Sequence, residues 1–326
     1  MPIKAAVSFA NVICRFGDRY VLQDLADQIV VPAFTDATLR REFGSTRYFF
    51  LDVGLAVSAD SVSADSTPLR YLYGRLVKDT VLTREQVYSP VTGLTQAPQT
   101  LPSAPSSFFT LILDNHKMIY FPETAGAPAM GAFQSTLQRF LMTKYRQYIN
   151  ALFAEYKEQG EPISKKQLYI EIPAPQLEVL HLTSRASIED FVAAFDKITH
   201  VEFKILATND EFQMQHTYEE LRSLKRSIGA KSTKLVHDNP EGLDPKNTME
   251  QIHAATATGN QKAVLAGISH DGVKLRGNND DFKVSVPVDL PSEDPARAAQ
   301  MVELFKDQTE RGIIAVDVPS DADQKS

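Results

Sequence analysis

The stretch SSFFTLILDNHKMIYF, residues 106–121, decides how the chain folds. Two runs, Phe108–Leu113 and Met118–Phe121, are rich in aromatic and aliphatic residues, and the turn-prone segment Asp114–Lys117 separates them. This pattern predicts a β-hairpin with a loop of about four residues. Because nearly every position in both arms is apolar, we expect the hairpin to be central in its sheet and covered on both faces.

A long amphipathic helix is predicted after the proline- and glycine-rich break at 122–131. Its apolar residues recur at spacings of three and four, so they share one face of the helix. These residues are Phe133, Leu137, Phe140, Leu141, Tyr145, Tyr148, Leu152, Phe153 and Tyr156. Arg139 and Arg146 lie on another face. A solvated helix surface is the simpler interpretation of this pair, but its spacing also permits contact with a polyanion.

The composition predicts a globular protein. The chain has 326 residues, of which 43% are hydrophobic and 23% charged, and its formal net charge is −7. Its single cysteine, Cys14, excludes a disulfide within the chain and a cysteine-based metal cage. No apolar run approaches the roughly 20 residues that span a bilayer. We therefore expect a cytoplasmic protein without direct membrane insertion, and the acidic total argues mildly against nucleic acid as a partner.

Breaks in composition divide the chain into two domains, and the fold class predicted for the whole is α+β. Gly160 and Pro162, followed by lysines, mark the end of the long helix and a domain boundary. The elements predicted beyond it alternate strand and helix and end in a hairpin, as in a compact α+β domain. The apolar face of a last helix, 293–311, is expected to pack back on the first domain. The predicted parts are a mixed-sheet globular domain (1–165 plus 291–318), a smaller, swivel-like inserted α+β domain (166–290) and a disordered tail (319–326).

Local signals predict the remaining elements. Asp271-Gly272 is typical of a two-residue hairpin turn, and Gly229 is typical of the end of a helix. The predicted strands include 168–173 and 201–207, and the predicted helices include 187–198 and 214–228. An exposed low-complexity loop is expected at 58–66, no element is assigned at 81–94, and an extended surface connection is expected at 95–107.

Positive charge gathers between positions 221 and 236, with no acidic residue among the cations. These cations are Arg222, Lys225, Arg226, Lys231 and Lys234. On a helix the first three would form one stripe, and we expect all three to be exposed. A solvated helix end explains the run as well as a phosphate-binding patch does.

Known catalytic motifs are absent from the sequence. It has no glycine-rich phosphate loop, G-x-S-x-G elbow, H-E-x-x-H pair or kinase signature. Its seven histidines never lie three or four positions apart, so we expect no catalytic residue, metal site or cofactor. One enzymatic alternative is a metal-dependent nuclease in which Asp271 and Asp281 hold Mg²⁺ beside Lys283. The acid-x-lysine pattern recurs elsewhere in the chain, so it carries little information.

Residues 107–311 resemble the RexA-type phage-exclusion proteins and their relatives in bacterial antiphage systems. The resemblance rests on the order of segments: the strands FFTLIL and MIYF, the loop ETAGAPAMGAF, the helix STLQRFL, a basic stretch, and KVSVPVDL before a closing helix. It implies an inserted or swivelling α+β domain, dimerisation, and sequence-tolerant binding of double-stranded DNA. It also implies signalling to a separate membrane or effector protein, and it supplies no catalytic residues.

With this resemblance, the sequence predicts a non-enzymatic protein of an antiphage system that binds double-stranded DNA largely independently of sequence and forms a homodimer. The expected DNA-binding residues are Arg222, Lys225, Arg226, Lys231, Lys234, Arg139 and Arg146. Two alternatives stay open. One is the metal-dependent nuclease, and the other is an interaction protein that never touches DNA, which the net acidity favours.

Overall fold

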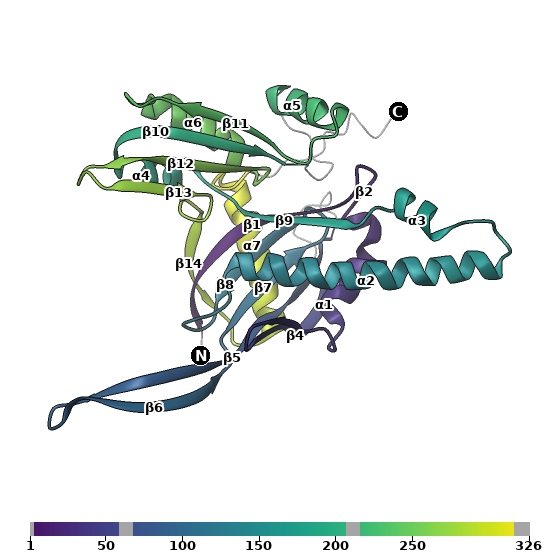
Figure 1. Cartoon of the computed structure of the whole chain (residues 1–326), viewed down its shortest axis with the longest axis horizontal. Coiled ribbons are helices and arrows are strands. Elements are labelled where there is room, and N and C mark those ends of the chain that lie inside the picture. The colour runs from purple at the N-terminus through teal and green to yellow at the C-terminus, as the bar shows by residue number, and fades with distance from the viewer. Residues whose placement is uncertain (1–2, 59–67, 207–215, 316–326) are drawn as a thin grey trace.

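The computed structural model describes residues 3–58, 68–206 and 216–315, and within these ranges the chain forms two antiparallel sheets and seven α-helices (Figure 1). The expected α+β class is confirmed. The strands are β1 (Ile3–Phe16), β2 (Tyr20–Val21), β3 (Arg41–Phe43), β4 (Thr46–Val57), β5 (Arg70–Ser89), β6 (Gly93–Ser103), β7 (Ser106–Ile112), β8 (Lys117–Pro122), β9 (Pro175–His181), β10 (Phe195–Ile205), β11 (Thr233–Asp238), β12 (Gln261–Ser269), β13 (Lys274–Asn278) and β14 (Ser285–Leu290).

The helices are α1 (Val31–Thr35), α2 (Met130–Glu158), α3 (Lys165–Glu171), α4 (Arg185–Val192), α5 (His216–Ser227), α6 (Pro245–Thr256) and α7 (Asp294–Glu310). Short 3₁₀ and π-helical turns, Gln23–Leu25 and Ala26–Val30, precede α1. None of the described helices combines the length and the hydropathy that crossing a membrane requires. The tail expected at 319–326, and all but the first residue of the loop expected at 58–66, lie outside the described residues.

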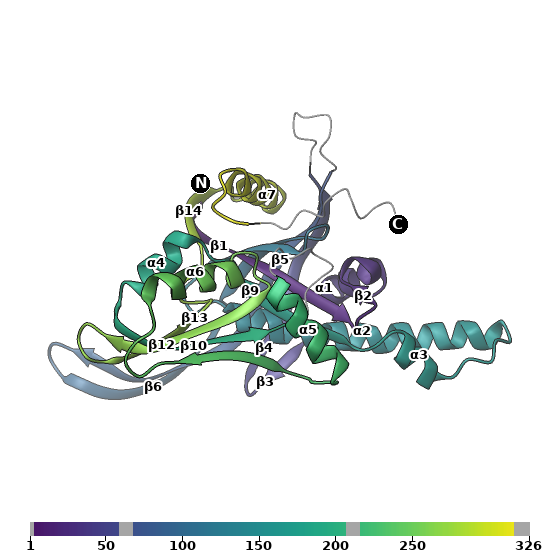
Figure 2. The ribbon, with the colours of Figure 1, turned by 90° about the horizontal axis from the view of Figure 1, so that it is seen from above.

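The predicted hairpin, β7–β8, forms the centre of the larger sheet, whose strands run in the order β14-β1-β8-β7-β5-β4-β3. Successive residues of a strand face opposite sides of the sheet. Phe109 and Tyr120 accordingly pack in one core with α2, while Phe108 and Phe121 pack in a second core with α7. Figure 2 shows α2 and α7 on opposite sides of this sheet. The hairpin is therefore covered on both faces and the closing helix packs on the first domain, as predicted.

β1 pairs with four other strands of this sheet. One edge pairs first with β14, along Ile3–Ser8, and then with β9, along Ala10–Phe16. The other edge pairs with β8 and β2. Both faces are covered as well, so residues 7–14 are buried without interruption. This burial explains why the N-terminal sequence is apolar but only weakly periodic.

The second domain is smaller than the predicted range 166–290. β9 and β14 both fall in that range, yet they pair with β1 of the larger sheet. The segment 168–173, predicted as a strand, lies mostly in α3. What remains is a four-stranded sheet in the order β11-β10-β12-β13 with α4, α5 and α6 and a core of its own. The break near Gly160 ends a helix rather than a domain, and the pairing partner of a strand is not a local property.

Two helix predictions in the second domain have different outcomes. The predicted helix 187–198 is in fact α4, whose N-cap is Ser184 and whose third residue is Ser187, followed by the start of β10. The predicted helix 214–228 corresponds to α5, and Gly229 after it has a φ of 66°, a conformation that glycine adopts without strain. A hairpin turn is also confirmed at Asp271-Gly272 between β12 and β13, but its loop has three residues, 270–272, because Ser269 donates to the carbonyl of Val273 (2.9 Å).

A long ribbon of β5 and β6 takes the place of the unassigned segment 81–94 and of most of the connection expected at 95–107. β5 continues past Asp79, where its pairing with β4 ends, and there pairs only with β6. Figure 1 shows this β5–β6 arm projecting away from the body of the protein. Two directly opposed pairs of exposed apolar residues lie on it, Leu82 with Leu101 and Tyr88 with Leu94. These residues show no strand pattern because both faces of the ribbon are solvated and β6 holds two prolines.

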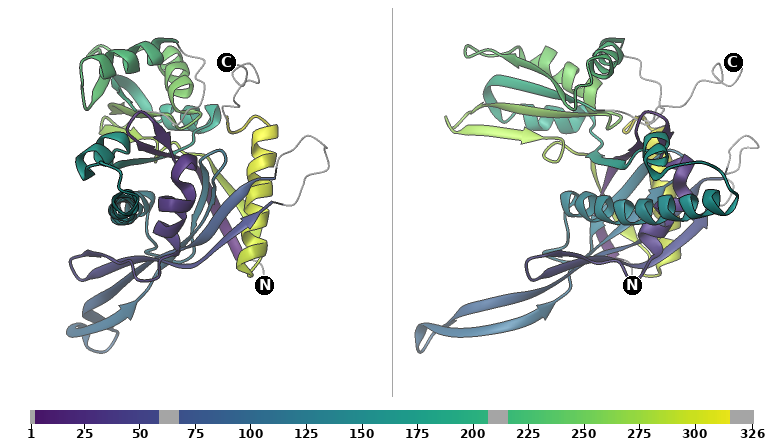
Figure 3. Two further views of the ribbon diagram at one scale, coloured as in Figure 1. Left: turned by 90° about the vertical axis from the view of Figure 1, so that its right-hand side faces the viewer. Right: turned by 45° about the vertical axis from the view of Figure 1, so that its right-hand side comes forward.

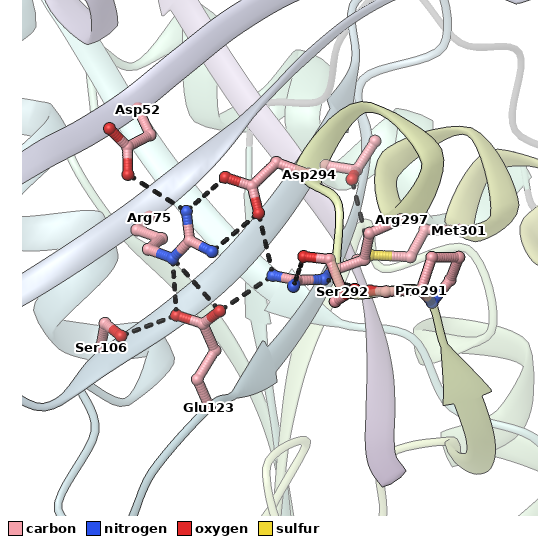
Figure 4. Close-up of polar contacts among 10 residues, drawn as sticks. Asp52, Arg75, Ser106, Glu123, Pro291, Ser292, Asp294, Arg297 and Met301 are labelled. Atoms are coloured by element: carbon pink, nitrogen blue, oxygen red, sulfur yellow. Dashed lines mark hydrogen bonds and ion pairs between the residues drawn. The ribbon is translucent and has the colours of Figure 1, made fainter. Parts of the chain in front are cut away.

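A network of charged side chains fixes α7 to the larger sheet (Figure 4). Arg297 of α7 is only 2% exposed, and its guanidinium donates to Glu123 at 2.9 Å. Arg75 of β5 also donates to Glu123 (3.0 Å) and forms an ion pair with Asp294, in the first turn of α7. Both guanidinium groups lie over the ring of Phe108. Arg75 forms a further ion pair with the more exposed Asp52 (3.2 Å), so two cations and three anions compensate one another where α7 begins.

Glu123→Gln is expected to lower the free energy of unfolding by about 3 kcal/mol, because it leaves two largely buried arginines short of one negative charge. The measurement is urea denaturation followed by circular dichroism. Asp79→Asn is the control, since it breaks the solvent-exposed pair of Arg47 and Asp79 (2.7 Å) and is expected to cost less than about 1 kcal/mol. Equal losses in the two variants would show that the network does not anchor α7.

The two domains meet at a buried polar joint. The Asn11 amide donates to Asn260 Oδ1 (2.9 Å), and Lys117 Nζ donates to Asn11 Oδ1 (3.1 Å). The hydroxyls of Thr183 and Thr256 are hydrogen-bonded at 2.7 Å. The backbone of Gly259 lies against Asn11, and a Cβ atom at position 259 would be only 2.7 Å from the Cβ atom of Asn11. The joint therefore requires a residue without a side chain at position 259, which has a φ of 73°.

Two buried histidines flank this joint. His116 and His181 are each 5% exposed, and in each the Nδ1 atom has no hydrogen-bond partner among the described residues. Burial, followed by the charge of Lys117, lowers the pKa of His116 to about 4. Burial also lowers the pKa of His181, against the opposing effect of Asp280. Both imidazoles are therefore neutral at neutral pH, and protonating either one opposes folding.

Stability is expected to decline as the pH falls from about 6.5, the pKa of an unfolded histidine, toward 4. The folded pKa of His116 is depressed, so its contribution is complete above pH 6.5 and is lost on acidification, by as much as about 3 kcal/mol. Urea denaturation at several pH values measures this loss. His116→Asn should flatten the profile, since asparagine tolerates the φ of 58° at this position. His237→Asn, at an exposed site, is the control, and a His116→Asn profile as steep as the parent's would contradict this account.

Candidate functional site

Two glutamine side chains join α2 to β9. The side chain of Gln138 accepts from the backbone N–H of Leu177 (2.8 Å) and donates to the carbonyl of Pro175 (2.9 Å). Gln134, one turn earlier, accepts from Val179 (3.2 Å) and donates to Leu177 (3.1 Å). They bond backbone groups along the edge of β9 that does not pair with β1. We call this junction the α2–β9 seam.

A hollow of about 430 Å³, here the α2 hollow, lies on one side of the seam. It is lined by Arg41 and Glu42 of β3 and by Ser135, Gln138, Arg139, Met142, Thr143 and Arg146 of α2. Arg41 Nη1 donates to Thr136 Oγ1 (3.4 Å), which places its guanidinium against α2. Arg139 and Arg146 are exposed. Three arginines oppose one glutamate here, so the hollow has a positive potential.

A second hollow, of about 390 Å³, lies between the two domains on the other side of the seam. This interdomain hollow is lined by Ile13, Arg15, Gln138, Pro175, Gln176, Leu177, Glu178, Lys204, Leu206, Lys225 and Lys231. Lys204 forms an ion pair with Glu178 (2.9 Å). Lys225 Nζ donates to the carbonyl of Ile205 (3.3 Å), and burial, followed by the charge of Lys204, lowers its pKa. Four cations oppose one glutamate.

The two hollows adjoin, because Gln138 lines both of them. Cations from five elements and from the segment after α5 therefore lie along one surface that crosses the seam. We call them the basic band, and its members are Arg15, Arg41, Arg139, Arg146, Lys204, Lys225 and Lys231. Such an arrangement can hold several anionic groups of one extended ligand.

The structure brings together four of the seven sequence-predicted residues: Arg139, Arg146, Lys225 and Lys231. The other three lie elsewhere. Arg226 is exposed on α5 but lines neither hollow. Lys234 forms an ion pair with Glu202 (2.9 Å) across β10 and β11.

Arg222 is the clearest error in the sequence analysis. It is 9% exposed, and its Nε donates to the carbonyl of Leu206 at 3.0 Å. Burial lowers its pKa to about 10, which still leaves it protonated at neutral pH. Spacings of three and four show that residues share a helix face, but they do not say which way that face points. In α5 this face is buried at Arg222, half-buried at Lys225 and exposed at Arg226.

Three members of the band were not found from the sequence: Arg15, Arg41 and Lys204. Each lies on a different strand, and no local pattern distinguishes it from an ordinary surface residue. Only the pairing of β1 with β9 and the attachment of β3 near α2 bring them to one surface. A signal for them would require long-range contacts.

The residues of the nuclease alternative do not converge. Asp271 lies in the turn before β13, whereas Asp281 and Lys283 follow its other end. Asp281 accepts from the backbone N–H of Asn278 (2.8 Å), and Lys283 donates to the carbonyl of Asp280 (3.0 Å). Across the described ranges, no group of three or more histidine, cysteine or carboxylate residues is placed to hold a metal ion.

Arg222→Ala is expected to lower the free energy of unfolding by about 2 kcal/mol, because it removes a charged donor from a buried carbonyl and leaves a packing defect. Arg226→Ala, four positions away on the same helix, removes the same charge from an exposed position and is expected to change stability by less than about 0.5 kcal/mol. Urea denaturation compares the two variants, and indistinguishable values would mean that Arg222 is not a structural residue.

Comparison with known proteins adds no assignment to this site, since no protein-family model matches the chain and no curated protein matches it.

Proposed function

We propose that the protein is a non-enzymatic DNA-binding protein that holds the phosphate backbone along the basic band. The observation that carries this proposal is the meeting of two cation-lined hollows at Gln138, on a chain with a net charge of −7. A local concentration of arginine and lysine on an acidic protein is suited to a polyanion, because binding depends on the local field.

The spacing of the cations suits a nucleic acid backbone. Arg139 and Arg146 are separated by two helical turns, or about 10 Å along the axis of α2. One DNA strand rises about 3.4 Å per nucleotide, so that distance corresponds to roughly three phosphates. Phosphate contacts position a protein on DNA without reading its sequence, so binding is expected to depend little on sequence. The resemblance of residues 107–311 to RexA-type proteins adds the rest of the proposal, a role in antiphage defence with a separate membrane or effector partner.

A second candidate is an interaction with another protein, through the β5–β6 arm. Leu82, Leu101, Tyr88 and Leu94 expose apolar surface there. Residues 81–103 carry only one cation and one anion, Arg84 and Glu85, so this surface offers no net charge to DNA. The arm therefore favours a protein surface, either that of a second copy in a homodimer or that of an effector.

The double variant Arg139→Ala/Arg146→Ala is expected to weaken binding to duplex DNA and to flatten its salt dependence. Each lost phosphate contact removes about 0.9 from the slope of log K against log salt, so two contacts remove roughly two. Lys225→Ala/Lys231→Ala is expected to act similarly at the interdomain hollow. Fluorescence anisotropy over a salt series, with two duplexes of unrelated sequence, measures both effects.

The matched control is Lys306→Ala/Arg311→Ala, which removes one cation of α7 and one immediately after it, across the sheet from α2. It should leave affinity and slope unchanged. If the band variants bind duplex with the parent's slope, the band is a solvated surface and the proposal fails. Mg²⁺-dependent cleavage of plasmid by the parent protein would instead support the nuclease alternative.

A further inference from the structure

The hairpin formed by β3 and the start of β4 carries aromatic rings next to the α2 hollow. In the left-hand view of Figure 3 this purple hairpin lies near α2, which is seen end on. The turn passes through Gly44, and Phe43 immediately before it is 70% exposed. A single exposed ring is ordinary on a protein surface, so the groups around Phe43 decide its role.

Arginine side chains lie against the rings of this hairpin. The guanidinium carbon of Arg41 is 5.8 Å from the ring centroid of Phe43 and 5.0 Å from that of Tyr48. The guanidinium carbon of Arg40 is 4.1 Å from the ring centroid of Phe49. These distances are typical of cation–π contacts, which orient the cations. Phe43 nevertheless keeps most of its surface available to a ligand.

The hairpin lies on the path of the basic band. Arg41 and Glu42 line the α2 hollow, and Phe43 is the next residue of the same strand. Of the three arginines in residues 40–49, Arg47 is paired with Asp79; the other two, with one glutamate, leave a net positive charge, so the ligand that reaches Phe43 should be anionic. A phosphate backbone that crosses the hollow past Arg139 and Arg41 arrives beside an exposed aromatic ring.

We propose that Phe43 stacks on an unpaired nucleobase, so that the DNA preferred by the basic band contains a single-stranded segment such as a gap or a fork. This inference rests on the proposed function and specifies the class of substrate. Arg41 of the band holds the adjacent phosphate, and Phe43 supplies the platform for the base. A positively charged groove with aromatic platforms is the usual means of binding single strands.

The stacking step discriminates between paired and unpaired DNA for a physical reason. Within an intact duplex both faces of each base are covered by neighbouring base pairs, so an aromatic ring outside the helix meets only sugars and phosphates. An unpaired base has a free face, and covering it with Phe43 removes apolar surface of both rings from water. Stacking on Phe43 therefore adds binding free energy only where the duplex is interrupted.

The experiment titrates three DNAs by fluorescence anisotropy at one salt concentration: an intact duplex, the same duplex with a gap of several nucleotides, and a single-stranded oligothymidine. Phe43→Ala is expected to lose about 5- to 150-fold in affinity for the gapped and single-stranded DNAs, and less than about twofold for the intact duplex. Tyr88→Ala is the matched control, because Tyr88 is equally exposed (71%) but lies on the β5–β6 arm.

A second readout does not depend on affinity. The sequence contains no tryptophan, so Phe43→Trp introduces the only indole of the protein and keeps a ring that can stack. Its emission is expected to be quenched by the gapped and single-stranded DNAs and unchanged by the intact duplex. Thermal melts of both Phe43 variants should match the parent, because the replaced side chain is exposed.

The possible failures can be told apart. If Phe43→Ala binds all three DNAs like the parent while Arg139→Ala/Arg146→Ala weakens all three, the stacking proposal is wrong and the basic band stands. If the parent binds none of the DNAs, the proposed function itself is wrong. If the indole emission responds to protein concentration and not to DNA, Phe43 is a protein contact and the proposal is overturned.

Discussion

The division of one edge of β1 between two partners determines how the whole molecule is arranged. β14 occupies the first half of that edge and β9 the second half. Between them, Leu182 donates to the carbonyl of Phe9 and Val284 donates to the carbonyl of Leu182, at 2.8 and 2.9 Å. The chain therefore enters and leaves the second domain through adjacent backbone segments. That domain is an insertion into the edge of a sheet, and its position follows from the ladder of β1.

The same constraint positions the basic band. β9 pairs with β1 on one edge only, and buried strand edges must satisfy their backbone groups. Gln134 and Gln138 of α2 meet this need, so the helix is fixed to the strand that leads into the second domain. The cations of α2 then lie on one side of β9 and those of β10 and α5 on the other. Hydrogen bonds made for structural reasons thus bring two groups of cations to one surface.

The features that could be predicted from the sequence are those that depend on residues close together in the chain. The hairpin at 106–121, the helix α2 and the Asp271-Gly272 turn depend on neighbouring residues, and all three are found. The nearly continuous apolar residues of both hairpin arms also predict that the hairpin is covered on both faces. The arm, by contrast, has no apolar periodicity because no core covers it. The residues of β9 and β14 were placed in the wrong domain, because the partners of these strands lie far away in the sequence.

The residues of the candidate site also separate into those with a local sequence signal and those without one. Arg139 and Arg146 were found because one helix presents both, and Lys225 and Lys231 because charge clusters near them. Arg222 was included wrongly, since a charge pattern on a helix does not reveal which face meets the core. Arg15, Arg41 and Lys204 could not be found, because they lie on three different strands that only the assembled fold brings to one surface.

The acidity of the whole chain and the basicity of the band are compatible because charges act over short distances in salt. At 0.1 M salt the Debye length is about 10 Å. Asp307 and Glu310 lie on α7, across the sheet from α2, on the order of 20 Å away through two packed layers. Their repulsion is therefore largely screened at the band, where Glu42 and Glu178 are the acidic residues that line the hollows. Glu178 is already occupied by Lys204. The total charge thus governs how a polyanion approaches from a distance, mainly at low salt, whereas the band governs the contact itself.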